Sequence, residues 1–262
     1  MSVSSNLPAP EMPQGPWGLF LDIDGTLLEH AAHPDAVVVD DELRTLLAQL
    51  ESQLDGALAF ITGRSIAAVD HLFQPLRLPA AGLYGLEHRL TRDGPVEAAG
   101  EPADIAALAN EIATELDNAD VYIERKGPIL AIHTRAAPHL LRRATELVEQ
   151  ALGKLPAGYR VLAGNAGVEL MPLEAAKGAA IRRFMQIPTF RGRRPVFLGD
   201  DTSDENGFEA VNEMGGISVR IKPCGLTAAP FALAGVDAAL AWLGGMSRSE
   251  IARAATLAAM PK

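Results

Sequence analysis

Short, strongly apolar segments recur in the first and last thirds of the chain. Four of them are Trp17–Ile23, Ala57–Ile61, Pro195–Leu198 and Gly216–Ile221. Segments this short and this apolar are typical of parallel strands that are buried on both faces of a sheet. The first three close on polar residues, which places acids, hydroxyls and an arginine at the ends of predicted strands.

Helical periodicity fills the gaps between these segments. The segment Asp41–Leu54 has an apolar stripe along one face, formed by Leu43, Leu46, Leu47 and Leu50. Glu174–Met185 and Ser203–Met214 are predicted as further helices. Because strands and helices alternate, we expect an α/β fold with a doubly wound, Rossmann-like parallel sheet.

The middle of the chain has a different pattern. Apolar residues fall at helical spacing in Ala103–Asp117 and in Pro138–Lys154. Between them, Val121–Lys126 and Ile129–Arg135 flank the turn signal Gly127-Pro128. A two-residue turn there gives the predicted hairpin one polar and one apolar face. The polar face consists of Tyr122, Glu124, Lys126, His133 and Arg135, and the apolar face of Val121, Ile123, Leu130 and Ile132.

The contrast between a buried parallel sheet and a one-sided antiparallel sheet indicates two domains. We expect residues 17–85 and 172–262 to form the parallel-sheet core domain, and residues 86–171 to form an α+β domain inserted into it. Residues 1–16 are rich in Pro and Ser and are expected to be a disordered leader.

Composition limits the partners more than the fold. The 262 residues have a formal net charge of −10, so no nucleic-acid or anionic membrane partner is expected. No apolar segment approaches the roughly 20 residues of a membrane-spanning helix. Cys224 is the one cysteine, so the chain has no internal disulfide. We expect a soluble, cytoplasmic protein, whose oligomeric state the sequence leaves open.

The first candidate site follows the first predicted strand. Asp22 and Asp24 lie two residues apart, so both carboxylates project from the same side of the strand end. Open parallel sheets bind ligands at this edge, and a divalent cation is a common way to hold converging carboxylates together. The alternative interpretation is a solvated strand end capped by aspartate.

A second acidic cluster supports a metal site. Asp200, Asp201 and Asp204 follow the predicted strand Pro195–Leu198. Such an oxygen-rich group suits Mg²⁺, a hard cation that prefers carboxylates and water. An alternative role, compatible with the first, is an N-cap in which Ser203 or Asp204 opens the following helix.

Two further motifs offer groups that bind anions. Thr62 and Gly63 follow a predicted strand and supply a hydroxyl and backbone amides, and Arg64 can clamp phosphoryl oxygens. Lys177 lies in the first part of a predicted helix, where the helix dipole slightly disfavours a cation. A lysine required for its charge would accept that cost, whereas the alternative is an ordinary solvated lysine.

The order of these motifs resembles the haloacid dehalogenase superfamily. The four matching motifs are Asp22-x-Asp24-Gly25-Thr26, Thr62, Lys177 and Gly199-Asp200-Asp201-x-x-Asp204. The insertion between the second and third motifs resembles the C2B cap of the sugar-phosphatase branch. Within that branch, about residues 19–243 are similar to the trehalose-6-phosphate phosphatase family. The supporting stretches are Gly82–Glu87, Glu124–Gly127, His133–Arg135, Val168–Pro172 and Asp200–Phe208. Tyr84 departs from the family, which often has His there.

The resemblance implies a magnesium-dependent phosphatase that acts on trehalose 6-phosphate through an aspartyl-phosphate. Asp22 would be the nucleophile and Asp24 the general acid and base. Thr62 and Lys177 would meet the charge of the phosphoryl group. The implied Mg²⁺ ligands are Asp22, Asp24 through its carbonyl, Asp200 and Asp201. The implied sugar-binding residues are Arg64, Glu124, Lys126, Arg135 and Glu169, of which those in the cap could instead be part of a solvated sheet face.

Three other functions fit parts of this pattern. The first is a phosphatase of another phosphorylated glycoside, such as glucosylglycerol or mannosylglycerate phosphate. The second is a sugar phosphomutase, which would return an isomerised sugar phosphate instead of inorganic phosphate. The third is a non-catalytic phosphosugar sensor, which is disfavoured because Asp22, Asp24, Lys177 and Asp200 are all present.

Overall fold

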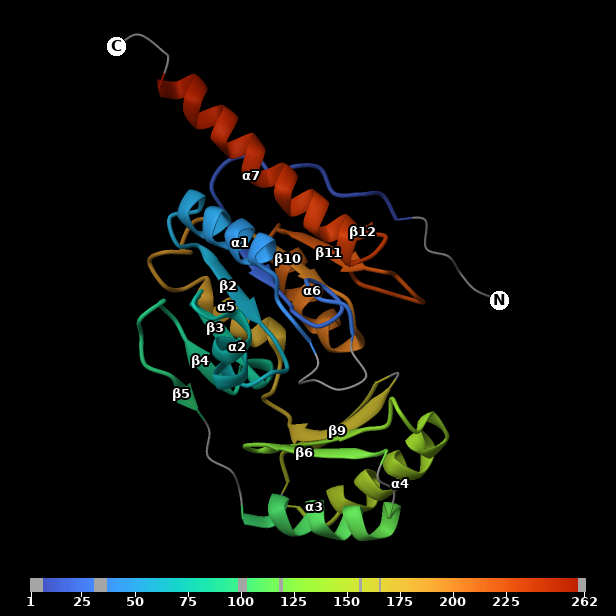
Figure 1. Ribbon diagram of the computed structural model, residues 1–262. Coiled ribbons are helices and arrows are strands. Elements are labelled where there is room, and N and C mark those ends of the chain that lie inside the picture. The colour runs from blue at the N-terminus through green and yellow to red at the C-terminus, as the bar shows by residue number, and fades with distance from the viewer. Residues whose placement is uncertain are drawn as a thin grey trace. The chain divides into compact units, whose positions relative to one another are not determined.

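The computed structural model describes residues 7–30, 37–98, 103–117, 120–155, 157–164 and 166–258, with residue 103 and residues 248–258 described by their backbone alone. The chain divides into two compact units (Figure 1). Unit 1 consists of Met1–Val96 and Lys177–Lys262, and unit 2 of Glu97–Ala176. The predicted domain limits at residues 86 and 171 stay a prediction.

Unit 1 is built on a mostly parallel sheet. Its strands within unit 1 are β1 (Trp17–Leu21), β2 (Leu58–Ile61), β3 (Ala80–Gly82), β4 (Glu87–Arg89), β10 (Arg194–Gly199), β11 (Ile217–Ile221) and β12 (Phe231–Leu233). Their order in the sheet is β12-β11-β10-β1-β2-β3-β4. The strands run parallel from β12 to β3, and β4 is antiparallel to β3. All residues of β1 and β2 are buried, which explains why both segments are apolar throughout.

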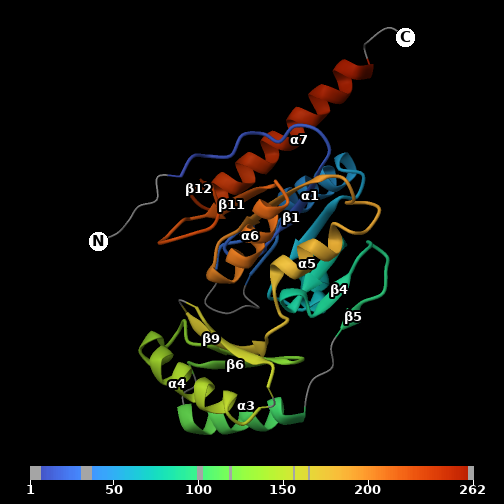
Figure 2. The ribbon, with the colours of Figure 1, turned by 180° about the vertical axis from the view of Figure 1, so that it is seen from behind.

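Helices cover both faces of this sheet, which confirms the predicted doubly wound α/β fold. α1 (Asp41–Gln53) packs against α7 (Val236–Ala258) on one face, and α5 (Lys177–Phe184) packs against α6 (Glu205–Glu213) on the other (Figures 1 and 2). α2 (Ile66–Phe73) follows β2. α1 begins where predicted because the Asp40 carboxylate accepts a hydrogen bond from the Leu43 N–H at 2.7 Å.

The N-terminal segment differs from its prediction. Its composition predicts disorder for residues 1–16, but residues 7–16 lie along unit 1. The Pro8 carbonyl accepts a hydrogen bond from the Ala232 N–H at 3.0 Å, and the Pro10 carbonyl accepts one from Trp242 Nε1 at 3.0 Å. Proline lacks an N–H but keeps its carbonyl, so a proline-rich segment can still be anchored through its oxygens. The remaining residues, 1–6, lie outside the described part of the chain.

Unit 2 is a four-stranded antiparallel sheet with two helices on one face. Its elements are α3 (Ala103–Leu116), β6 (Tyr122–Lys126), β7 (Ile129–His133), α4 (Leu141–Leu152), β8 (Tyr159–Ala163) and β9 (Gly167–Pro172), with the strands in the order β6-β7-β9-β8. Leu130 and Ile132 of β7 share an apolar cluster with Leu147 and Val148 of α4. Lys126 pairs with Ile129 across the two-residue turn, as the sequence predicts.

The predicted polar face of this hairpin is correct except at Arg135. Tyr122 pairs with His133, so the two side chains lie on the same face of the sheet. However, β7 ends at His133, and Arg135 is exposed in the following turn. There the Ala137 N–H donates to the Thr134 carbonyl at 2.9 Å, and this turn leads into α4. The predicted strand Ile129–Arg135 is therefore two residues too long.

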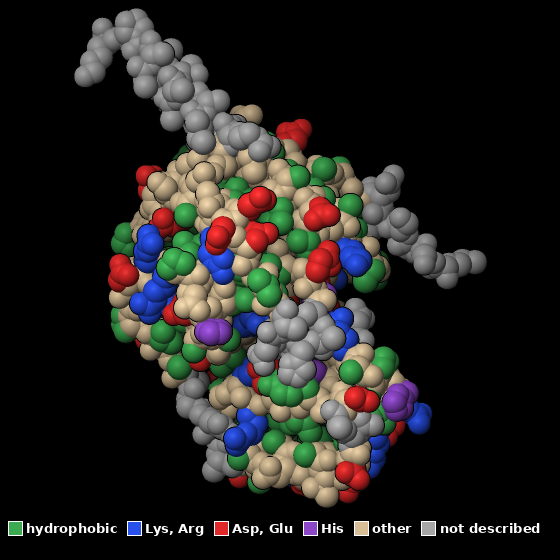
Figure 3. Space-filling view, in the orientation of Figure 1, with side chains coloured by type: hydrophobic (Ala, Val, Ile, Leu, Met, Phe, Trp, Pro, Cys, Tyr) green, Lys and Arg blue, Asp and Glu red, His purple; other side chains and the backbone are tan. Residues whose placement is uncertain are grey.

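Two surface properties bear on partners. Among the described residues, no helix combines the length and the apolar character needed to cross a membrane. Figure 3 shows Lys and Arg side chains intermingled with Asp and Glu side chains over the visible face of the described residues. The basic groups that an anionic ligand needs are therefore best sought within individual sites.

Candidate active site

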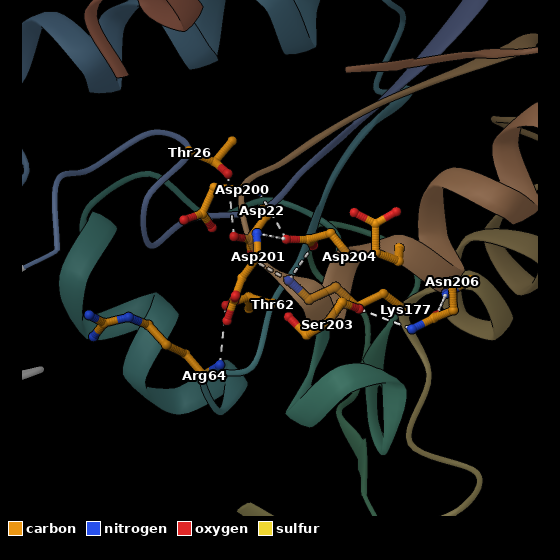
Figure 4. Close-up of polar contacts among 12 residues, drawn as sticks. Asp22, Thr26, Thr62, Arg64, Lys177, Asp200, Asp201, Ser203, Asp204 and Asn206 are labelled. Atoms are coloured by element: carbon orange, nitrogen blue, oxygen red, sulfur yellow. Dashed lines mark hydrogen bonds and ion pairs between the residues drawn. The ribbon is translucent and has the colours of Figure 1, made fainter. Parts of the chain in front are cut away.

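The end of β1 lies between the ends of β10 and β2. Leu21 pairs with Leu198 of β10 on one side and with Phe60 of β2 on the other. The Asp22 N–H continues this pattern by donating to the Leu198 carbonyl at 3.0 Å. The register therefore brings Asp22 to the sheet edge where the segments that begin at Thr62 and Asp200 also emerge (Figure 4).

Lys177 joins two carboxylates at this edge. Its Nζ lies 2.7 Å from Asp22 Oδ1 and 2.6 Å from Asp204 Oδ1 (Figure 4). The exposed fractions of the three side chains are only 2%, 6% and 0%. Burial disfavours the ammonium, but the charges of Asp204 and Asp22 outweigh burial and raise the pKa of Lys177. Lys177 is therefore not a solvated lysine, and its positive charge belongs to this site.

Two acids at this edge of the sheet, Asp22 and Asp200, have raised pKa values. Burial raises the pKa of the Asp22 carboxyl well above its usual range, although the Lys177 charge lowers it in part, and Asp204 and Asp200 raise it further. Burial also raises the pKa of Asp200, against the lowering effect of its hydrogen bond to His30. A group of carboxylates with raised pKa values is stabilised by additional positive charge.

Three of these acids form a cluster that fits a metal ion. Asp22, Asp200 and Asp204 each bring one oxygen, and these atoms lie within 4.8 Å of one another. Asp200 Oδ1 is buried and has no hydrogen-bond partner among the described residues. In contrast, Asp204 Oδ2 accepts hydrogen bonds from the N–H groups of Asp200 and Asp201 at 3.0 and 2.9 Å. Asp200 is therefore the freest of the three ligands for a hard divalent cation. Asp22 faces Lys177 through Oδ1 and accepts a hydrogen bond from the Thr26 hydroxyl through Oδ2 at 3.4 Å.

The side chains of two predicted metal ligands, Asp24 and Asp201, have other partners. The Asp201 side chain accepts a hydrogen bond from the Asp204 N–H and forms a capping box on the short 3₁₀ helix Thr202–Asp204. Asp201 thus caps this short helix, whereas Asp204 stands at the predicted N-cap position of the following helix, α6, but makes no side-chain capping bond there. The two oxygens of Asp24 accept hydrogen bonds from Arg64 Nε and Nη2, both at 2.7 Å. Neither side chain belongs to the three-acid cluster, so their part in metal binding stays a prediction.

Thr62 and Arg64 form the second predicted motif. Thr62 is 1% exposed, and its hydroxyl accepts a hydrogen bond from the Arg64 N–H at 3.1 Å (Figure 4). The Arg64 guanidinium makes a bidentate pair with Asp24, a strong and directional interaction. Its predicted contact with a substrate stays a prediction.

His30 is a site residue that sequence reasoning missed. Its Nε2 lies 3.0 Å from Asp200 Oδ2. Both atoms crowd Gly25, where an added Cβ would lie 2.0 Å from Asp200 Oδ2 and 2.6 Å from His30 Nε2. Gly25 also has a φ of 80°, so a glycine is required there on both grounds. His30 lies in a loop without periodicity, and the sequence contains no signal for its contact.

Three of the predicted sugar-binding residues form a hydrogen-bonded group on the polar face of unit 2. Lys126 Nζ donates to Glu169 Oε1 at 2.9 Å and lies 3.8 Å from Glu124 Oε2. His133 Nε2 lies 2.9 Å from Glu124 Oε2, and the His133 ring stacks on Tyr122 with the centroids 5.5 Å apart. Arg135 has no place in this group because it lies beyond the strand. The group offers carboxylates and an ammonium to sugar hydroxyls, a role that stays a prediction.

Comparisons with known proteins bear on the family. A sequence model of the family described as Trehalose-phosphatase matches residues 20–237. A probable trehalose-phosphate phosphatase of Sinorhizobium fredii is 43% identical over 87% of this chain and 88% of its own length. Trehalose-6-phosphate phosphatase of Escherichia coli is 40% identical over 86% of this chain and 84% of its own length.

Solved structures share the fold at lower identity. The C-terminal domain of trehalose-6-phosphate phosphatase from Candida albicans matches with a TM-score of 0.78 at 22% identity, covering 92% of this chain and 98% of that one. A phosphatase of the haloalkanoate (HAD) enzyme superfamily from Bacteroides thetaiotaomicron matches with a TM-score of 0.57 at 20% identity, covering 92% and 99%. The family match over most of the sequence, together with relatives at 43% and 40% identity, shows that this chain belongs to the trehalose-phosphatase family.

Proposed function

We propose that this protein hydrolyses trehalose 6-phosphate to trehalose and inorganic phosphate, with Mg²⁺ as its cofactor. The observation that supports it most is the buried Lys177 between Asp22 and Asp204, beside an Asp200 oxygen that has no hydrogen-bond partner in the described part of the chain. The two relatives named for this activity, at 43% and 40% identity, support the choice of substrate. The single cysteine and the net charge of −10 favour a cytoplasmic protein without a nucleic-acid partner.

In the first step, a carboxylate oxygen of Asp22 attacks phosphorus. The bond between phosphorus and the sugar oxygen breaks, and Asp24 gives that oxygen a proton. This leaves free sugar and an aspartyl-phosphate. Lys177 and the Thr62 hydroxyl stabilise the charge on the phosphoryl oxygens. Because Arg64 holds both oxygens of Asp24 at 2.7 Å, Asp24 reaches the leaving oxygen only after Arg64 releases it.

In the second step, a water molecule attacks phosphorus and gives a proton to Asp24. The bond between phosphorus and Asp22 breaks, which restores the carboxylate and releases inorganic phosphate. Asp22, Asp200 and the carbonyl of Asp24 would hold Mg²⁺, which supplies Lewis-acid stabilisation of the phosphoryl oxygens when bound. Asp204 supports these groups through Lys177 and the backbone of Asp200.

Phosphate release from a panel of phosphosugars, with and without Mg²⁺, tests this proposal. We expect trehalose 6-phosphate to react faster than glucosylglycerol phosphate or mannosylglycerate phosphate. Chelation with EDTA should lower the rate at least about 100-fold, because the buried acids then face the substrate with only Lys177 to offset their charge. Added Mg²⁺ should restore the rate. Full activity in EDTA would remove the metal from the proposal, and an isomerised sugar phosphate as product would indicate a mutase.

The sugar site is tested by replacing Glu124 with Ala. Glu124 Oε2 lies 2.9 Å from His133 Nε2 and 3.8 Å from Lys126 Nζ. We expect it to accept hydrogen bonds from sugar hydroxyls. Its loss should lower kcat/KM for trehalose 6-phosphate about 10- to 100-fold and that for p-nitrophenyl phosphate, which has no sugar, less than about threefold. Glu111→Ala, an exposed change in the same unit, is the matched control for both esters. Equal losses on the two esters would remove Glu124 from the sugar site.

A further inference from the structure

Two consecutive residues beside the active site have a strained backbone. After β3, Leu83 has a φ of 49° and Tyr84 a φ of 57°, the left-handed region that residues with a Cβ rarely occupy. The turn is fixed by the Tyr84 N–H, which donates to the Thr62 carbonyl at 2.9 Å, and by the Leu83 N–H, which donates to the Arg64 carbonyl at 3.0 Å. Such strain persists only where the surroundings enforce it, and it clusters at functional sites.

The turn directs the Tyr84 ring onto two parts of the active site. A Cβ added to Gly63 would lie 2.6 Å from both Cζ and Oη of Tyr84, so the hydroxyl end of the ring packs directly on the Gly63 backbone. The ring centroid also lies 5.8 Å from Lys177 Nζ, within the range of a cation–π contact. One side chain therefore contacts both the phosphate-binding segment Thr62–Arg64 and the buried ammonium.

We propose that Tyr84 is a positioning residue for phosphoryl transfer. Its ring, aimed by the strained turn, holds the Thr62–Arg64 backbone and the Lys177 ammonium in the places where they meet the phosphoryl group. Gly63 and Tyr84 act as one packed pair, and position 63 has to be a glycine because the ring occupies the space of a side chain. This inference rests on the proposed phosphatase function, and Tyr84 acts through its neighbours without touching the reacting atoms.

Two variants distinguish the role of the Tyr84 ring from the roles of the turn and of the hydroxyl: Tyr84→Asn and Tyr84→Phe. Asparagine tolerates the left-handed region, so Tyr84→Asn removes the ring and keeps the turn. Because small misplacements of catalytic groups are costly, its kcat on trehalose 6-phosphate and on p-nitrophenyl phosphate should fall about 10- to 100-fold, with KM changed less than about threefold. Tyr84→Phe keeps the ring and should retain at least about a third of kcat.

Three results would overturn the proposed role of the Tyr84 ring. Unchanged kcat in Tyr84→Asn would show that the ring is not needed. An equally large loss in Tyr84→Phe would transfer the role to the hydroxyl. A loss confined to trehalose 6-phosphate would place Tyr84 in sugar recognition instead of phosphoryl transfer, which also contradicts the proposal.

The substitution Gly63→Ala gives a readout that does not depend on catalysis. In the wild-type background its methyl group meets the ring, so the thermal unfolding midpoint should fall by about 2–10 °C. In the Tyr84→Asn background the ring is absent, and the same change should cost less than about 2 °C. Gly235→Ala, where an added Cβ meets nothing within 4 Å, is the matched control.

The two backgrounds also separate this inference from the proposed function. Equal shifts in both backgrounds would show that Gly63 and Tyr84 are not coupled and would overturn the packed pair. A wild-type protein that releases no phosphate would refute the proposed function. In that case the midpoint shifts would still report the packing, whereas the role in phosphoryl transfer would fall with the function.

Discussion

Replacing Asp22 with Asn is expected to abolish phosphate release in a protein that remains folded. The amide cannot form an acyl-phosphate, so the rate should fall by on the order of 10⁴-fold or more. The fold should tolerate the change because Asn has nearly the same size and because Lys177 keeps Asp204 as a partner at 2.6 Å. The change also removes one of several buried, mutually repelling acids. The thermal midpoint should therefore stay within about 3 °C.

Two measurements check this prediction. Phosphate release reports turnover, and the intact-protein mass after an acid quench reports whether a phosphoryl group is attached. The wild-type protein should trap a phosphoryl group and the Asp22→Asn variant should trap none. Asp41→Asn makes the same chemical change at an aspartate of α1 whose side chain is 99% exposed, and should alter neither readout. Turnover that persists without Asp22 would contradict its assignment as nucleophile.

The strand ends of the site were accessible from the sequence because they follow a simple rule. Parallel strands expose their carboxyl ends at one edge of a sheet, so polar residues after several apolar segments converge there. The rule predicts that Asp22, Thr62 and Asp200 lie at one edge. Lys177 was a weaker candidate, because its place between Asp22 and Asp204 depends on a helix that begins 155 residues after Asp22 along the chain.

Local backbone conformation and side-chain pairs between loops could not be predicted from the sequence by this rule. Residue preferences argue against a left-handed Tyr84, and only its tertiary contacts enforce that conformation. The sequence indicates that Arg64 binds phosphoryl oxygens, whereas in the structure its guanidinium holds the Asp24 carboxylate. Arg135 continues the strand pattern, yet the chain turns before reaching it. Each difference arises from tertiary contacts between distant segments, and the hydrophobic periodicity of a single segment contains no information about such contacts.

Replacing Lys177 with Met is expected to lower both activity and stability. Methionine keeps most of the length of the side chain and tolerates a buried, apolar environment, so the main change is the loss of charge. Without the ammonium on the phosphoryl oxygens, kcat should fall about 10²- to 10³-fold. Removing one partner of a buried ion pair costs about 3–5 kcal/mol of unfolding free energy, which lowers the thermal midpoint by about 6–20 °C.

The stability loss in Lys177→Met should depend on pH when it is measured in EDTA. Burial and the neighbouring acids already raise the folded-state pKa of Asp22, and removing Lys177, which lowers it in part, raises that pKa further above its unfolded value. The folded state then binds more protons than the unfolded state, so stability falls as the pH rises, and the deficit is larger at about pH 8 than at about pH 5. In the wild type the raised pKa of Lys177 keeps its contribution present throughout this range, and that contribution is lost only in alkaline solution.

A matched control and a second substitution show whether charge is the cause. Lys154→Met breaks an exposed ion pair with Glu111 and should cost less than about 1 kcal/mol, with no loss of turnover. Adding Asp204→Asn to Lys177→Met removes one unpaired buried carboxylate, so part of the stability should return while activity does not. If the double variant were no more stable than Lys177→Met, the loss would come from packing. Full turnover in Lys177→Met would contradict the proposed role of Lys177. Asp22 would then act as nucleophile without the ammonium that it contacts at 2.7 Å, and other groups would stabilise the charge of the phosphoryl oxygens.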